Sequence, residues 1–400
     1  EIHKLKIQIG GIVNVRSKIL KIIILTILFI QIFSIKTFAT STEEEMINSQ
    51  KETFGINSFI ENANKYTGEF FEGIDINSML NSAIKGKIDN KTIYKKIINL
   101  LGKEVKTGIK SLVSILIIIV IHSILKSISE NLQNDNVSKM IYYVQYIAIV
   151  TVIMNNFSNV ITMVKETATN LVGFMNSLVP ILVSLMLYTG SITTSSILEP
   201  AILFMINFIG NIIQSFLIPA VLIAATLSIV SKIGDKVQID KISKTFNSGI
   251  IWILGVILTT FVGVISLEGT LSSSIDGITA KTAKAIVSSS IPIVGKILGD
   301  AVDTVLGCGI ILKNAIGVIG VVIIIGICIM PIIKIAILTI SYKILASISE
   351  PIADTKIIKL LEQIGDIFKV LLAILCSISV MVIVGTTLVI KISNSGMMYR

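Results

Sequence analysis

Residues 309–331 read GIILKNAIGVIGVVIIIGICIMP, a continuous apolar run about as long as a bilayer-spanning helix. Its apolar residues do not alternate with polar ones, so the run predicts a helix and not a strand of a barrel. The sequence therefore predicts an all-α, polytopic helical membrane protein. Comparable segments recur at 111–128, 139–157, 171–190, 198–231, 249–267, 332–349 and 367–390.

The composition supports the same fold class. Charged residues make up 15% of the 400 residues, hydrophobic residues make up 53%, and the mean hydropathy is +0.87. Soluble domains carry about 25% charged residues, so the composition excludes an ordinary soluble protein. The net charge is +9, and the lysines flank apolar segments without interleaved aromatics. This distribution favours contact with a lipid bilayer and indicates no nucleic acid partner.

The amino-terminal residues have the pattern of an export signal. Basic residues precede the apolar core ILTILFIQIFSI, and Thr37, Phe38 and Ala39 provide a cleavage site after Ala39. We expect residues 1–39 to be a signal peptide or an uncleaved anchor, and residues 40–108 to be exported. This polar region is acidic in its first half and basic in its second, with apolar residues at helical spacing. We therefore expect it to be mostly helical.

The number of crossings depends on two prolines. Segment 198–231 is too long for one simple crossing, and Pro219 interrupts it, so it forms either two short passes or a re-entrant hairpin. The alternative is a single tilted helix, and we expect the hairpin. With residues 40–108 outside, this hairpin places residues 232–248 inside, where their lysines satisfy the positive-inside rule. A further break at Pro331 brings the expected total to seven or eight transmembrane helices.

The crossings form two groups on either side of an extracytoplasmic segment. We expect a first membrane helix group over residues 109–267, an extracytoplasmic amphipathic helix within residues 268–308, and a second membrane helix group over residues 309–400. The same topology makes residues 158–170 an outside loop, puts residues 350–366 outside, and puts the carboxyl-terminal end inside.

Residues 281–306 carry an apolar stripe and a polar stripe at helical spacing. Asp300 and Asp303 on the polar face have a spacing that would suit an acid–base pair or a divalent cation. No histidine, third acidic residue or nucleophile accompanies them, so we interpret this face as a docking or vestibule-lining surface. A G-x-x-x-G pattern beside it permits close helix contact. The candidate residues of this region are Pro292, Gly295, Lys296, Gly299, Asp300, Asp303, Lys313 and Asn314.

A second polar stripe lies within segment 198–231. Asn207, Asn211 and Gln214 project from one side of a helix in hydrocarbon, where each amide must find a hydrogen bond. They serve either as hydrogen bonds between helices or as the lining of a water path.

Catalytic and cofactor motifs are absent from the sequence. The three cysteines, Cys308, Cys328 and Cys376, are far apart and lie in or beside apolar segments, which favours packing over a disulfide. The two histidines exclude a histidine-rich metal site, and the position of His122 within an apolar run favours helix packing over a proton relay. No nucleotide-binding or nucleophile motif occurs. We expect no catalytic, cofactor-binding or metal-binding residues, and no enzyme.

Two regions carry a family resemblance. The motifs P-x-V-G, D-A-x-D-T-V, K-N-A-x-G, P-x-x-K-I and E-P follow one another within residues 291–352. Residues 178–200 read LVPILVSLMLYTGSITTSSILEP. In this order and spacing, the chain resembles the stage III sporulation protein AE family.

The resemblance implies a non-enzymatic membrane subunit of the channel or export complex that links mother cell and forespore in sporulation. It implies partners among the other stage III A sporulation membrane proteins, including a cytoplasmic ATPase and ring-forming subunits. It also implies a location in the mother-cell membrane around the forespore. Without the resemblance, the alternative is a stand-alone secondary transporter or permease for a small solute, since Pro219 and Pro331 predict broken helices of the kind that bind ions.

Overall fold

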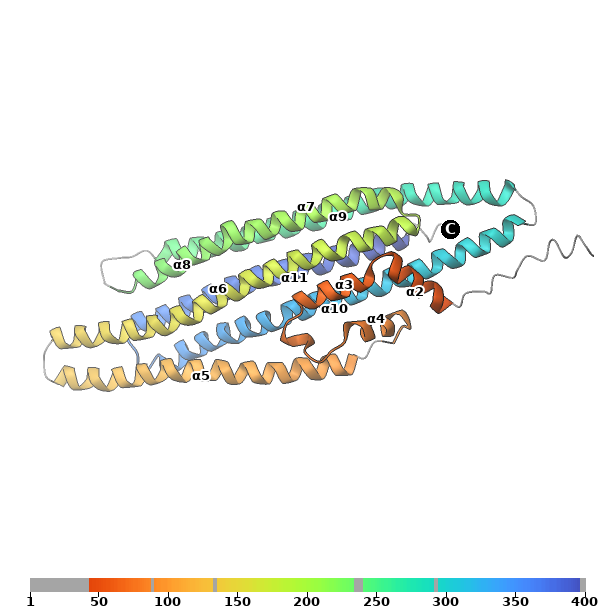
Figure 1. The fold of residues 1–400 in the computed structure, drawn as a ribbon. Helices are drawn as coiled ribbons and strands as arrows, with labels where there is room; N and C mark the ends of the chain where they lie inside the picture. Colours follow the sequence, from red (N-terminus) through yellow and green to blue (C-terminus); the bar gives the residue numbers. More distant parts are fainter. Residues whose placement is uncertain (1–42, 88–89, 132–134, 234–239, 291–293, 396–400) are drawn as a thin grey trace, which may run out of the picture. The chain divides into compact units, whose positions relative to one another are not determined.

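The computed structural model describes residues 43–87, 90–131, 135–233, 240–290 and 294–395, and these residues form helices and no strand (Figure 1). The all-α fold is thus confirmed, while the export signal expected over residues 1–39 lies outside the described residues. The elements are α2 (Glu43–Thr53), α3 (Ile56–Tyr66), η1 (Glu69–Phe71), α4 (Ile76–Ile84), α5 (Asn90–Asn131), α6 (Asp135–Tyr188), α7 (Ile192–Ile212), η2 (Ile213–Leu217), α8 (Ile218–Val230), α9 (Asp240–Ser290), α10 (Val294–Ser349) and α11 (Thr355–Ser395).

The chain divides into two compact units between Ser49 and Gln50. Of the first unit, the structure describes only the start of α2. All contacts given below belong to the second unit. Within its described residues, six helices are long and apolar enough to cross a membrane, so the expected seven or eight crossings are not confirmed.

Helix α6 runs without a break through residues 158–170, which we expected to form an outside loop. These residues are polar, but they contain no glycine or proline, and polarity alone does not end a helix. The hydroxyls of Thr167 and Thr169 donate to carbonyls one turn earlier, those of Met163 and Lys165, and so fit within the helix.

The expected hairpin over residues 198–231 is also wrong. Helices α7 and α8 continue one another through the short π-helix η2, and the backbone at both joints is right-handed helical. Pro219 lies in the first turn of α8, where its missing N–H removes little, and the wider π turn precedes it. Pro331 likewise lies inside an uninterrupted α10, because transmembrane helices tolerate proline when neighbouring groups compensate.

Two of these differences cancel in the topology. Each removes one crossing before residues 232–248, so Lys232 stays at the same end of the bundle as the end of α5 and the start of α6, as expected. The Tyr142 hydroxyl donates to the Lys232 carbonyl at 2.7 Å, which fixes this neighbourhood. The start of residues 350–366 lies at this end too, and not at the opposite end as expected, because Asp354 contacts Lys126.

The segment 268–308 is divided between two long helices. Its first part belongs to the end of α9, its last part begins α10, and residues 291–293 between them lie outside the described residues. That this segment lies outside the cytoplasm stays a prediction.

The core of the second unit forms where the long helices pack side by side, most extensively between α10 and α11. Gly317 allows α11 to approach closely, because an added Cβ there would collide with Ile390. The polar amino-terminal region packs on the same bundle, with Tyr66 against Gly173 and Phe71 against Gly326. Buried glycines are therefore the points at which neighbouring elements come closest.

The length of the apolar helices exceeds the thickness of a bilayer. Helix α6 has 54 residues and α10 has 56, about 80 Å each at 1.5 Å per residue, whereas the hydrocarbon layer is about 30 Å thick. Large apolar side chains are exposed near both ends of α6, at Met140 and Val144 and again at Leu187. One bilayer therefore cannot cover all of this apolar surface.

We expect the variant Gly317→Val to lower the free energy of unfolding by about 1–3 kcal/mol, since the larger side chain separates α10 from α11. Thermal unfolding of the detergent-solubilised protein measures the change. Gly307→Val on the same helix is the matched control, because a Cβ at Gly307 meets nothing within 4 Å. Equal losses in the two variants would contradict the close packing at Gly317.

Candidate functional site

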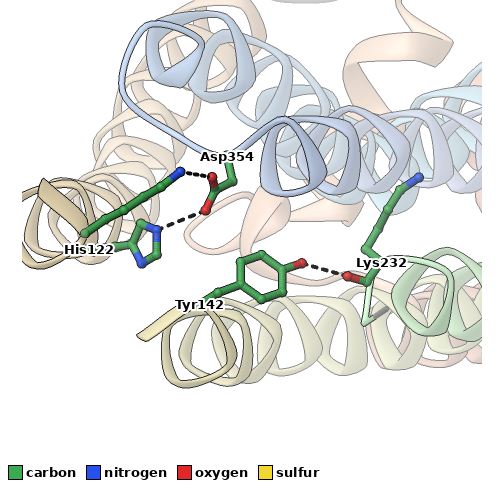
Figure 2. A network of polar contacts seen from close by, with 5 residues as sticks. His122, Tyr142, Lys232 and Asp354 are labelled. Carbon is green, nitrogen blue, oxygen red and sulfur yellow. Dashed lines mark hydrogen bonds and ion pairs between the residues drawn. The ribbon is translucent and has the colours of Figure 1, made fainter. Parts of the chain in front are cut away.

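Four helix ends meet in a polar junction that Figure 2 shows. His122 and Lys126 lie one turn apart near the end of α5, and Asp354 lies in the turn between α10 and α11. The His122 Nε2 lies 3.1 Å from Asp354 Oδ2, and Lys126 Nζ donates to Asp354 Oδ1 in an ion pair. One carboxylate therefore joins the first long helix of the bundle to its last pair.

The electrostatics of the junction favour an ionised Asp354. The hydrogen bond from His122 and the charge and hydrogen bond of Lys126 lower the pKa of Asp354 from its ordinary value of 3.8 to about 2, against the opposing effect of burial. His122 is only 2% exposed, so the imidazole depends on this carboxylate for its hydrogen bond. Loss of Asp354 would leave both basic side chains without this partner.

The other half of the junction closes the end of α8. Tyr142 donates to the Lys232 carbonyl at the end of α8. Tyr146 donates to the Ile229 carbonyl, which also accepts from the Lys232 N–H, so α6 adds hydrogen bonds to the last turn of α8. The ammonium of Lys356 lies 5.5 Å from the centre of the Tyr142 ring. This cation–π contact connects the α10–α11 turn to the same tyrosine.

The sequence singled out His122 but not its partner. The two residues are separated by 232 positions, a distance that no local spacing can bridge. A signal was nevertheless present, because a histidine and a lysine one turn apart in an apolar run require an acidic partner nearby. Glu350 and Asp354, in the turn before α11, are candidates that such a search would return.

Of the second predicted stripe, two residues bond to α6. Asn207 exchanges amide hydrogen bonds with Asn176, at 3.0 and 3.3 Å, and Gln214 donates to the Thr169 hydroxyl at 3.0 Å. Asn211 accepts from Ser215 on its own helix. All of these side chains are exposed, so the contacts fit hydrogen bonding between helices while the outer face stays open to a partner or to water.

The first predicted stripe is described only in part. The side chains of Pro292, Gly295, Lys296, Gly299 and Asp300 lie outside the described residues. Asp303 is exposed near the start of the α10 span, whereas Lys313 is buried and Asn314 is half-buried further along it. Whether this stripe docks a partner or lines a vestibule stays a prediction.

Helix α11 carries a charged face that the sequence analysis missed. Lys359, Glu362, Asp366 and Lys369 recur at helical spacing, and all four are exposed. The Asp366 carboxylate pairs with Lys343 of α10 at 2.9 Å, with side chains 52% and 49% exposed. The apolar segment predicted from the sequence starts at residue 367. Most of the charged face lies before that residue and therefore falls outside the predicted segment.

The charged face lies at the same level of the bundle as the apolar run of α5. Tyr342, next to the charged face, bonds to Asn156, and its neighbour Ser341 lies beside Gly108 of α5. The turn that precedes α11 meets α5 where Asp354 contacts His122. Between these two levels, α5 exposes Val113, Ile117 and Ile121. At one level of the bundle, therefore, α5 exposes apolar side chains and α11 exposes charged ones.

No group of three histidine, cysteine, aspartate or glutamate residues lies close enough to hold a metal ion within the part of the chain that the structure describes. What the arrangement offers chemically is a fixed ion pair with a buried imidazole, and a charged helix face within an apolar span. Both features suit positioning and docking.

Comparison with known proteins gives one family. The family model described as Stage III sporulation protein AE matches residues 74–393. Stage III sporulation protein AE of Bacillus subtilis (strain 168) is 31% identical over 306 residues, which cover 76% of this chain and 77% of the relative. No solved structure matches the chain.

We expect Asp354→Asn to lower the free energy of unfolding by about 2 kcal/mol at neutral pH, because the carboxylate loses its charge beside Lys126 and His122. Since the pKa of Asp354 is lowered from 3.8 to about 2 on folding, its stabilisation is present above about pH 4 and is lost as the pH falls towards 2. Unfolding measured between pH 7 and pH 2 should show the difference between wild type and variant narrowing over that window.

Asp366→Asn is the matched control for this measurement. It also removes a carboxylate that is paired with a lysine, here Lys343 of α10, but this pair is half-exposed and is expected to contribute under about 1 kcal/mol. A loss at neutral pH as large for Asp366→Asn as for Asp354→Asn would contradict a special role for the junction.

Proposed function

The chain belongs to the stage III sporulation protein AE family, and we propose that it is a non-enzymatic membrane subunit of the channel or export complex that links mother cell and forespore. Its family and its six apolar helices support a multi-pass membrane protein with a role in sporulation. The proposed location is the mother-cell membrane around the forespore. The proposed partners are the other stage III A membrane proteins, a cytoplasmic ATPase and ring-forming subunits.

The main structural support for this proposal is the charged face of α11. Charged side chains in hydrocarbon are costly, so Glu362, Asp366 and Lys369 must face water or a polar partner. The α5 surface at the same level is apolar and suits lipid. A subunit that lines or supports an aqueous path needs both kinds of surface.

The excess apolar surface supports assembly with partners. Because α6 and α10 are more than twice as long as a hydrocarbon layer is thick, part of their exposed apolar surface falls outside any one bilayer. Exposed apolar patches of this kind mark interaction surfaces between proteins. We propose that the neighbouring subunits of the complex cover it.

Orientation follows from the lysines. The end of the bundle that carries Lys126, Lys232 and Lys356 is proposed to face the cytoplasm, under the positive-inside rule. A cytoplasmic ATPase would then meet the polar junction, while the region of α3 and α4 would lie beyond the membrane and face the ring-forming subunits.

The transporter alternative loses its main structural argument. It depended on helices interrupted at Pro219 and Pro331, and both residues lie in continuous helical paths. Uptake of a small solute by the purified protein in liposomes would restore this alternative.

An in-frame deletion of the gene in the organism that encodes this protein is expected to arrest sporulation around engulfment, while vegetative growth stays normal. Microscopy through a sporulation time course measures the stage of arrest. Normal spores together with a growth or uptake defect would contradict the proposed function and favour the transporter.

The double variant Glu362→Leu with Lys369→Leu is expected to reduce spore yield by a large factor without lowering the amount of protein in the membrane. It leaves the net charge unchanged and makes the α11 face compatible with lipid, so a lipid-facing role would tolerate it. Spore counts and membrane immunoblots measure the two outcomes.

The control carries the same two changes on the polar helix α3, as Glu61→Leu with Lys65→Leu, where both side chains are exposed. We expect this control to affect spore yield less than the α11 variant does. If the α11 variant gave the wild-type spore yield, the proposal that this face contacts water or a docking partner would be wrong.

A further inference from the structure

A groove opens between α5 and α6 beside the polar junction. Its volume is about 410 Å³, within the roughly 300–1,000 Å³ range of ligand sites. Ile121 and Val144, which line it, are 52% and 65% exposed, so the groove opens to the outside of the bundle. Its lining is almost entirely apolar and includes Ile118, Ile121, Leu125, Met140, Val144 and Ala148.

Two buried polar side chains reach this groove. Gln145 is 4% exposed and His122 is 2% exposed, and both line it. Among the described residues, neither the nitrogen nor the oxygen of the Gln145 amide has a hydrogen-bond partner, and His122 Nδ1 has none. Figure 2 shows this second imidazole nitrogen turned away from Asp354. Buried amides without a partner are rare in native proteins, so a ligand that satisfies Gln145 is expected.

The surroundings indicate the chemistry of that ligand. Ile117, Ile124 and Ile147 beside the groove are exposed and apolar, so the surface suits hydrocarbon. The helix of a partner protein would not satisfy Gln145 with its backbone, because its carbonyls are already bonded within the helix. A lipid ester carbonyl is a free acceptor attached to an apolar chain.

We propose that this groove binds one acyl chain of a membrane glycerophospholipid, whose ester carbonyl accepts a hydrogen bond from the Gln145 amide. The inference does not depend on the sporulation complex, because it rests on the geometry of the α5–α6 pair alone.

Photo-crosslinking tests the proposal. The full chain is reconstituted into vesicles of phosphatidylcholine and phosphatidylglycerol that include a phosphatidylglycerol with a diazirine on its acyl chain. After irradiation, mass spectrometry maps the labelled residues. We expect labels to concentrate on the groove, and Gln145→Leu to lower labelling there about fivefold through loss of one hydrogen bond.

A second variant separates occupancy from folding. Ala148→Phe fills the groove and should nearly abolish its labelling. Ile147→Phe places the same side chain at the next residue, on the exposed surface, and should leave labelling unchanged. Thermal unfolding of the three variants checks that each is folded. Two results would overturn the proposal in favour of ordinary boundary lipid. One is labelling that is equally strong on the exposed α9 face around Trp252. The other is labelling of the groove that neither Gln145→Leu nor Ala148→Phe reduces.

Discussion

In hydrocarbon, every backbone N–H and C=O must find its partner inside the protein, and a helix meets this demand locally. This constraint explains why the helices of this chain continue where side-chain polarity suggests a loop. Through residues 158–170, α6 keeps its backbone bonds and presents polar side chains outward. At residues 213–217, the chain widens into a π turn and still does not break the helical path. The long helices then supply the frame for every other contact.

The class of fold could be read from the sequence because apolar length is a property of consecutive residues. The apolar runs from 111–128 to 367–390 all fall within helices that could cross a membrane. Helix ends were harder to predict, since Pro219 and Pro331 break isolated helices but fit where neighbours compensate. A count based on prolines and polar gaps gives more crossings than the six helices found within the described residues, although its two differences before residue 232 cancel in the orientation.

The candidate site was predictable only in part, because its members come from distant helices. His122 stood out as an ionisable group in an apolar run, but its contact with Asp354 depends on how α5 packs against the α10–α11 turn. The charged face of α11 was present in the spacing of Lys359, Glu362, Asp366 and Lys369. It was overlooked because a hydropathy window averages the two faces of an amphipathic helix. Reading each face separately recovers it.

The pairing of His122 and Lys126 with Asp354 also has a consequence for biosynthesis. The two basic residues leave the ribosome 232 and 228 positions before their acidic partner, an interval of roughly 10–50 s at typical translation rates. During that interval α5 must insert with its lysine and imidazole near the edge of the bilayer before Asp354 has been made. Water at the interface, lipid phosphate or the insertion machinery has to solvate them until the last hairpin arrives. Completion of the bundle therefore comes late in synthesis, and a protein truncated before the α10–α11 turn would lack the acidic partner of both basic residues.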